Sequence, residues 1–137
     1  MKYNPDSHPH SELTEKIIGA AMAVHRELGP GLEEKIYENA LCLELAAQDI
    51  DFTQQERFTV HYQGHVVGTM VTDLIVEQKV VIETKVADQI ADAHIAQTLS
   101  YLSISKLDIG IILNFKPASL GIKRVANTYI KKSVKSA

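Results

Sequence analysis

Two charged residues interrupt a run of β-branched residues in the middle of the chain, in the segment VVIETKV at residues 80–86. A run of this kind predicts a β-strand. Because successive side chains alternate between the two faces of a strand, Glu83 and Lys85 are expected to share one face, away from Ile82. A carboxylate and an ammonium group therefore lie together on a strand that is otherwise apolar.

A second carboxylate is expected beside Glu83. Asp73 lies in the preceding segment VTDLIV, and a hairpin loop centred on Gln78 would place it directly opposite Glu83. Directly opposed residues share a face with Cβ atoms about 4.5 to 5.5 Å apart, so the two carboxylates would repel each other. A divalent cation between them removes that cost, and oxygen ligands suit Mg²⁺ or Mn²⁺. With Lys85 available to position a water or to stabilise charge on a phosphate, the arrangement indicates phosphodiester hydrolysis.

A polar stripe on the next predicted helix, residues 88–104, would complete such a site. His94, Gln97 and Tyr101 are spaced three and four residues apart, so they lie on one face of that helix. Gln97 and Tyr101 could hydrogen-bond a phosphate or orient Lys85. Taken alone, a stripe of this kind more often faces solvent, and only its position directly after the Glu-x-Lys strand favours a role in the site.

A further carboxylate is a candidate in the segment GPGLEEKIYEN, residues 29–39. The glycines permit a chain reversal between two helices, and Glu34 in the first turn of the second helix would complement the positive end of the helix dipole. Glu34, Tyr37 and Glu38 also share one helical face, which could aim a carboxylate toward the sheet. The pattern alone favours capping and leaves the second role open.

Hydrophobic periodicity predicts the elements that must position these residues. Helices are expected at 11–28, 32–48 and 88–104, and strands at 52–62, 66–76, 80–86, 107–115 and 120–125. The buried side of the second helix is predicted to include Leu32, Ile36, Tyr37, Ala40, Leu43 and similar residues. The order helix, helix, three strands, helix, two strands predicts an α/β fold, with a mixed central β-sheet flanked by helices.

Composition bounds the domain organisation. At 137 residues, 45% of them hydrophobic, the chain has the size of one domain, predicted over residues 11–137 after a flexible N-terminus at residues 1–10. The one cysteine, Cys42, excludes an intrachain disulfide. No apolar run reaches about 18 residues, and the N-terminal segment is polar with two prolines, so we expect no membrane span, no signal peptide and a cytoplasmic location.

Charge is distributed unevenly along the chain. The net charge is -3 at pH 7, yet no acidic residue follows Asp108, while six lysines and arginines do. The overall charge argues against non-specific coating of nucleic acid. The basic C-terminal tail is open to two interpretations, a solvated tail or an edge that contacts phosphates.

Four motifs in order resemble those of a known family. The first matches the signature of the GxxExxY proteins, Gly31-x-x-Glu34-x-x-Tyr37. The other three follow the motif order of the PD-(D/E)xK nuclease superfamily: Asp73, then Glu83-Thr84-Lys85, then Gln97-x-x-x-Tyr101. The resemblance spans about residues 12–126, and four motifs in the right order are a far more specific signal than an isolated Glu-x-Lys.

The resemblance implies a restriction-endonuclease-like core and divalent-metal chemistry. Asp73 and Glu83 would hold Mg²⁺ or Mn²⁺, with the Thr84 carbonyl as a backbone ligand. Lys85 would assist the attacking water, and Glu34 would support the metal from its helix.

The same resemblance places residues of the following helix in the site and reveals one departure. Gln97 and Tyr101 would line the site, and His94 falls in the family's His-x-x-Gln stretch. Relatives often carry an arginine two residues before the motif aspartate, where this chain has Val71. Loss of a phosphate-binding cation would weaken substrate binding or mark a different substrate.

Three interpretations of the charged residues are open. The leading one is a metal-dependent nuclease that hydrolyses phosphodiester bonds of nucleic acid, with DNA as the expected substrate. The second is a catalytically silent nuclease fold that binds nucleic acid or protein. The third is a ladder of surface ion pairs between Asp73, Glu83 and Lys85, worth about 0 to 1 kcal/mol and needing no function. A domain this small has little surface for recognising a sequence, which indicates a homodimer or a protein partner.

Overall fold

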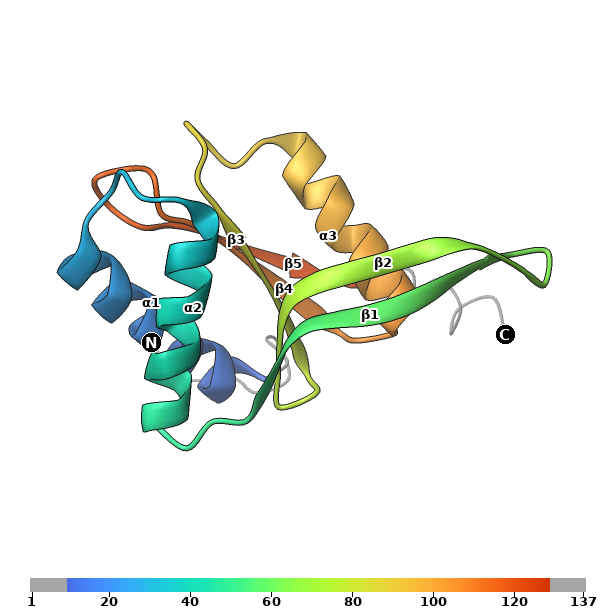
Figure 1. Cartoon of the computed structure of the whole chain (residues 1–137), viewed down its shortest axis with the longest axis horizontal. Helices are drawn as coiled ribbons and strands as arrows, with labels where there is room; N and C mark the ends of the chain where they lie inside the picture. The colour runs from blue at the N-terminus through green and yellow to red at the C-terminus, as the bar shows by residue number, and fades with distance from the viewer. Residues whose placement is uncertain (1–9, 129–137) are drawn as a thin grey trace.

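A mixed sheet forms the centre of the computed structural model, which describes residues 10–128 (Figure 1). The elements of this part of the chain are α1 (Ser11–Leu28), α2 (Glu34–Ala47), β1 (Phe52–Tyr62), β2 (His65–Val76), β3 (Val80–Lys85), α3 (Asp92–Ser105), β4 (Ile109–Asn114) and β5 (Gly121–Ala126). The strands lie in the order β1-β2-β3-β4-β5. Most of the predicted N-terminal segment and the end of the basic tail lie outside the described residues.

The pairing of the strands confirms the predicted α/β fold. β3 and β4 are parallel, and the other neighbouring strands are antiparallel. A parallel pair needs a long crossover connection, which α3 supplies between β3 and β4.

Helices cover both faces of the sheet (Figure 1). α1 and α2 share a buried core with Leu74 and Ile82, whereas α3 packs on a second core that contains Ile75 and Val81. Neighbouring residues of β2 and β3 thus belong to different cores, because side chains alternate along a strand. The predicted alternation on these two strands is therefore correct, and odd-numbered positions of β3 face α3.

The prediction of the buried side of α2 was partly wrong. Among the predicted residues, Leu32, Ile36 and Leu43 are exposed. Tyr37 is buried as predicted, and α2 also buries Glu38, Leu41, Cys42 and Leu45. α2 is apolar on more than one side, so periodicity alone does not determine its orientation. The ring of Tyr37 stacks on Phe115 with centroids 4.5 Å apart, and this contact turns its side of the helix inward.

The start of α3 also differs from the prediction, by four residues. The segment after β3 runs as a loop to Ala91. The loop is held by the Asn114 side chain, because its amide hydrogen-bonds both the N–H and the carbonyl of Ala87. Asn114 Oδ1 accepts from the Ala87 N–H at 3.0 Å, and Asn114 Nδ2 donates to the Ala87 carbonyl at 2.8 Å. Lys116 adds an ion pair to Asp88 at 2.6 Å. The helix therefore begins only at Asp92.

A glycine on β4 lets α3 approach the sheet closely. A Cβ built at Gly110 would lie 2.7 Å from Thr98 Cγ2, which is closer than two carbon atoms can approach. Thr98 is fully buried on the inner side of α3. The height of α3 above β4 therefore depends on the absence of a side chain at position 110.

We expect Gly110→Ala to lower the free energy of unfolding by about 1 to 3 kcal/mol, because the added methyl group overpacks this contact. Urea denaturation followed by circular dichroism measures the change. The matched control is Gly19→Ala in α1, where an added Cβ meets no atom within 4 Å. That substitution should stabilise the helix by up to about 1 kcal/mol. Equal effects of the two substitutions would contradict the close approach.

Candidate active site

The hairpin between β2 and β3 has the register that the sequence predicts. Leu74 pairs with Ile82, and Val76 with Val80, around a turn centred on Gln78. The ladder stops at Leu74, so the next pair in register, Asp73 and Glu83, lies where the two strands separate. Both carboxylates are therefore at the opening between β2 and β3.

The Asp73 carboxylate replaces a ladder bond at this opening. Its Oδ2 accepts from the Thr84 N–H at 2.9 Å and from the Thr84 hydroxyl at 3.0 Å. In a continuous ladder of the same register, Thr84 would instead pair with the main chain of Thr72. The N–H and C=O of one strand residue point the same way, so the Thr84 carbonyl also points toward the opening. The Lys85 carbonyl points the opposite way and accepts from Phe115 N–H at 2.9 Å.

The ladder is also interrupted on the β1 side of Asp73. Gln54 pairs with Leu74 and Glu56 with Thr72, but Gln55 between them has φ of 58° and no ladder partner. A positive φ is uncommon for a residue other than glycine. Gln55 was not predicted as a site residue, and no residue-type signal indicates it, because its conformation is imposed by the surrounding strands.

Burial makes the two carboxylates hard to ionise. Glu83 is 3% exposed, and burial, followed by the charge of Asp73, raises its pKa to about 8. Burial also raises the pKa of Asp73, although the hydrogen bond from Thr84 N–H opposes this. Within residues 10–128, Glu83 Oε1 is a buried oxygen with no hydrogen-bond partner. A buried oxygen without a partner fits a site that completes its contacts with a ligand.

α3 presents two polar side chains to this pair. Gln97 Oε1 accepts from Lys85 Nζ at 3.0 Å. The pKa of the Tyr101 hydroxyl is raised to about 12, first by burial and then by the charges of Glu83 and Asp73. Its proton therefore stays in place at neutral pH and can be donated in a hydrogen bond. The structure thus brings Lys85, Gln97 and Tyr101 together with the two carboxylates, as predicted.

His94 has a different place in α3. Its Nδ1 accepts from the Ala91 N–H at 3.0 Å, so the imidazole caps the start of the helix. Capping satisfies a main-chain donor that a helix N-terminus leaves free. His94 therefore holds the N-terminus of the helix that carries Gln97.

α2 contributes two carboxylates with different surroundings. Glu34 is exposed, and its Oε1 accepts from the Val86 N–H just beyond β3 at 3.2 Å. Glu38, one turn later, is 2% exposed and accepts from Gln54 at 2.7 Å and from Gln55 at 3.0 Å. The charge of Glu38 raises the pKa of both Asp73 and Glu83.

The carboxylate of α2 that acts on the pair is therefore Glu38. The shared helical face of Glu34, Tyr37 and Glu38 was the sequence signal for it, but that signal does not choose between two glutamates one turn apart. The role predicted for Glu34, support of a metal from its helix, stays a prediction.

The donors at the opening fit a hard cation. Asp73 and Glu83 supply carboxylate oxygens, one of them without a partner, and the Thr84 carbonyl points to the same opening. In residues 10–128, no three side chains of His, Cys, Asp or Glu converge as cation ligands. A metal would therefore depend on two carboxylates, a carbonyl and water, a donor set that Mg²⁺ accepts because it retains several waters.

Comparison with known proteins identifies the superfamily. Residues 11–125 match the profile of the PD-(D/E)XK nuclease superfamily, and the chain belongs to this superfamily. The crystal structure of SSO0001 is similar, with 19% sequence identity and a TM-score of 0.55, over 91% of this chain and 64% of that chain. At this identity the likeness shows the fold alone, and the chain spans under two thirds of that structure's length. A comparison with curated proteins found no match.

The closer assignment to the GxxExxY proteins within the superfamily stays a prediction. In the part of the chain that the structure describes, no helix is both long and apolar enough to span a membrane.

We expect Glu83→Gln to flatten the pH dependence of stability in metal-free buffer. The folded-state pKa of about 8 lies above the ordinary value of 4.5. The stability that Glu83 contributes is therefore fully present below about pH 4.5 and is lost as the pH rises toward 8. Glutamine cannot ionise, so the free energy of unfolding of the variant should rise relative to that of the wild type as the pH increases, by as much as a few kcal/mol.

Urea unfolding at several pH values between 4.5 and 9 measures this difference. Glu12→Gln, at an exposed position of α1, is the control and should follow the wild type. A difference between Glu83→Gln and the wild type that does not change with pH would contradict the raised pKa.

Proposed function

We propose that the chain is a metal-dependent nuclease that hydrolyses phosphodiester bonds of nucleic acid, with DNA as the expected substrate. The observation that supports it best is the opening between β2 and β3, where the buried carboxylate of Glu83 and the half-buried carboxylate of Asp73 lie beside Lys85. Glu83 Oε1 has no partner there within the described residues. Holding carboxylates away from water costs free energy and has little structural benefit. Two carboxylates next to an ammonium group can, however, bind a cation and a phosphate.

The metal would be held by residues already at the opening. Asp73, Glu83 and the Thr84 carbonyl would hold Mg²⁺ or Mn²⁺, which when bound supplies Lewis acidity and a more acidic water. The Asp73 carboxylate is oriented for this by its two hydrogen bonds from Thr84. Glu34 and Glu38 would add negative charge from α2.

The remaining residues would act on the substrate. Lys85, held by Gln97, places a positive charge where it can position the attacking water or stabilise charge that develops on the phosphate. Tyr101 keeps its proton and can donate a hydrogen bond to a phosphate oxygen. Hydrolysis then breaks the phosphorus–oxygen bond to the leaving group as the water oxygen bonds to phosphorus.

A cation is also present beside the position where relatives often have an arginine. Arg57 on β1 pairs directly with Val71 on β2. Directly opposed residues share a face of the sheet, so the Arg57 side chain leaves the sheet on the same face as Val71. We propose that Arg57 compensates for the missing arginine in binding a phosphate.

The setting of the activity is also proposed. We expect the protein to act in the cytoplasm, as the sequence predicts, and to bind nucleic acid as a homodimer or together with a protein partner. Single DNA-binding modules typically bury about 600 to 1,000 Å², whereas larger specific complexes bury up to about 2,500 Å², so a second copy or a protein partner would add contact area.

We expect Mn²⁺ to bind with the release of about one proton per ion at pH 7, because Glu83 must lose its proton to become a ligand. Isothermal titration calorimetry in two buffers of different ionisation enthalpy measures both the binding and the proton release. Glu83→Gln should weaken binding at least tenfold and abolish the proton release, whereas Glu12→Gln should leave both unchanged. Equal affinity of Glu83→Gln and the wild type for Mn²⁺ would show that the metal does not bind at this opening.

We expect the wild type to cleave DNA with Mg²⁺ or Mn²⁺, and Glu83→Ala and Lys85→Ala to lower the rate at least ~100-fold. Lys79→Ala, which removes an exposed lysine in the β2–β3 turn, should retain the rate. The assay uses single- and double-stranded DNA and RNA. Absence of cleavage of all four by the wild type would reject the nuclease. Nucleic-acid binding that persists unchanged in Glu83→Ala would then favour the catalytically silent module.

A further inference from the structure

The β1–β2 hairpin extends well beyond the rest of the sheet (Figure 1). β2 pairs with β3 only from Leu74 onward, so residues 56–72 form a two-stranded arm without a third strand. A tight turn at Gln63 and Gly64, both with positive φ, closes the arm. Every residue from 61 to 69 is exposed.

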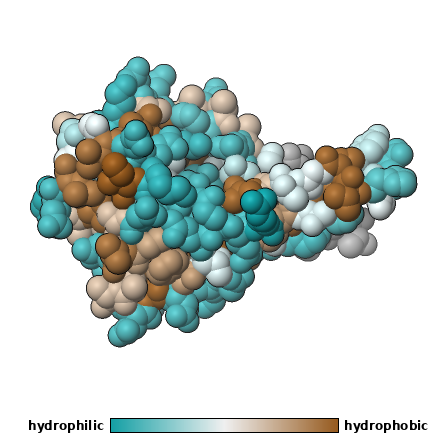
Figure 2. All heavy atoms as spheres, viewed as in Figure 1, coloured by the Kyte–Doolittle hydropathy of each residue, from teal (hydrophilic) through white to brown (hydrophobic). Residues whose placement is uncertain are grey.

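The end of this arm is apolar. Tyr62, Val66 and Val67 are 64%, 64% and 61% exposed, and we call these three residues the tip. Figure 2 shows the brown apolar side chains at the far end of the molecule. Large apolar side chains that gather at such exposure mark an interaction surface.

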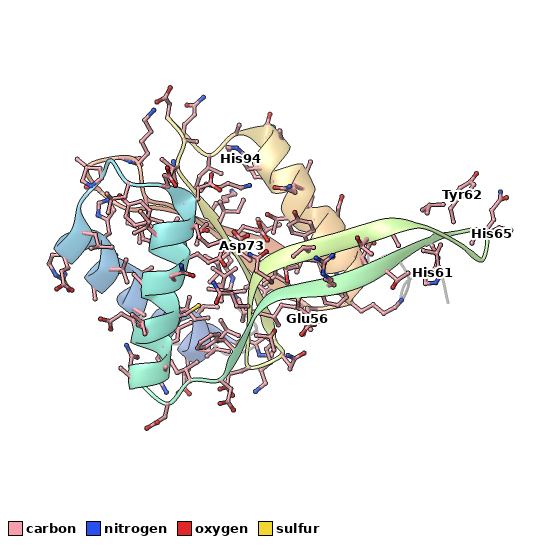
Figure 3. All side chains as sticks on the ribbon, in the orientation of Figure 1. Glu56, His61, Tyr62, His65, Asp73 and His94 are labelled. Atoms are coloured by element: carbon pink, nitrogen blue, oxygen red, sulfur yellow. The ribbon has the colours of Figure 1, made fainter. Side chains whose placement is uncertain are left out.

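The composition of the outer part of the arm, beyond Arg57, favours a protein partner over nucleic acid. From residue 58 to residue 72 the sequence contains no lysine and no arginine, which are the groups that hold phosphates. The same stretch contains no acidic residue, and His61 and His65 flank the tip (Figure 3). The tip is therefore apolar, with the imidazoles of His61 and His65 as its neighbours.

A second apolar surface lies between α1 and α2, on the side of α2 that was predicted to be buried. Val24, Leu28, Ala40 and Leu43 line a groove of about 180 Å³, and Glu27 and Glu44 complete its lining. Leu43 is 74% exposed. Apolar side chains are also visible at this end of the molecule in Figure 2. An apolar groove with two carboxylates complements an apolar tip with two imidazoles.

We propose that the tip of one copy of the chain docks in the α1–α2 groove of a second copy. The arm points away from α1 and α2, so the chain does not fill its own groove (Figure 1). Two copies in antiparallel orientation would exchange arms about a twofold axis and bury both tips and both grooves, which closes the assembly. This inference is independent of the proposed nuclease activity.

Sedimentation velocity of the full chain tests the proposal. The wild type should sediment as a dimer, and Val66→Lys and Leu43→Lys should each sediment as a monomer at the same concentration. Both replaced side chains are highly exposed, so circular dichroism should show unchanged folding. Met22→Lys is the matched control, because Met22 is 45% exposed on α1 but does not line the groove. It should remain dimeric.

A mixture of the two monomeric variants separates arm exchange from other dimers. Val66→Lys retains an intact groove and Leu43→Lys an intact tip, so one tip-groove contact can form between them. The two variants, each carrying a different affinity tag, should therefore copurify when mixed. Two differently tagged copies of the same variant should not copurify. A monomeric wild type would overturn the proposal. A dimer that survives Val66→Lys but not Leu43→Lys would also overturn it, because the helices would then pair without the arm.

Discussion

The interruption of the main-chain ladder at Asp73 is the feature on which the candidate site depends. A continuous antiparallel pairing would give each N–H and C=O of β2 and β3 a partner on the neighbouring strand. Here the Asp73 carboxylate receives the Thr84 N–H instead, and the two strands separate beyond Leu74. On the other side, Gln55 leaves the β region and its ladder position. The sheet is thereby opened at one point, where the carboxylate oxygens of Asp73 and Glu83 lie.

Burial gives this opening its chemical character. A carboxylate away from water resists ionisation unless a cation or hydrogen bonds stabilise its charge. Glu83 has such an environment, and the nearby charges of Asp73 and Glu38 increase the cost of ionising it. A ladder of surface ion pairs would instead leave the carboxylates exposed and paired. The juxtaposed carboxylates, the unpartnered Glu83 oxygen in the described residues and the superfamily match together favour metal and phosphate chemistry.

The packing and the capping of α3 bring the remaining polar groups to the opening. Gly110 allows Thr98 to lie close to β4, which lowers α3 until Gln97 reaches Lys85. His94 caps the same helix, so a conspicuous histidine of the polar stripe has a structural explanation. The chain has the fold of the PD-(D/E)XK nuclease superfamily, and α3 completes the polar lining of the opening in that fold.

Local patterns in the sequence determined the elements, their order and the register of the β2–β3 hairpin, because periodicity and turn position act over a few residues. They also placed Asp73 opposite Glu83. The orientation of α2 and the choice between Glu34 and Glu38 were decided only in the tertiary structure. Both depend on how α2 docks against β1 and Phe115, which are contacts between segments far apart in the chain. The conformation of Gln55 likewise arises from its neighbours on other elements, which no pattern within its own segment records.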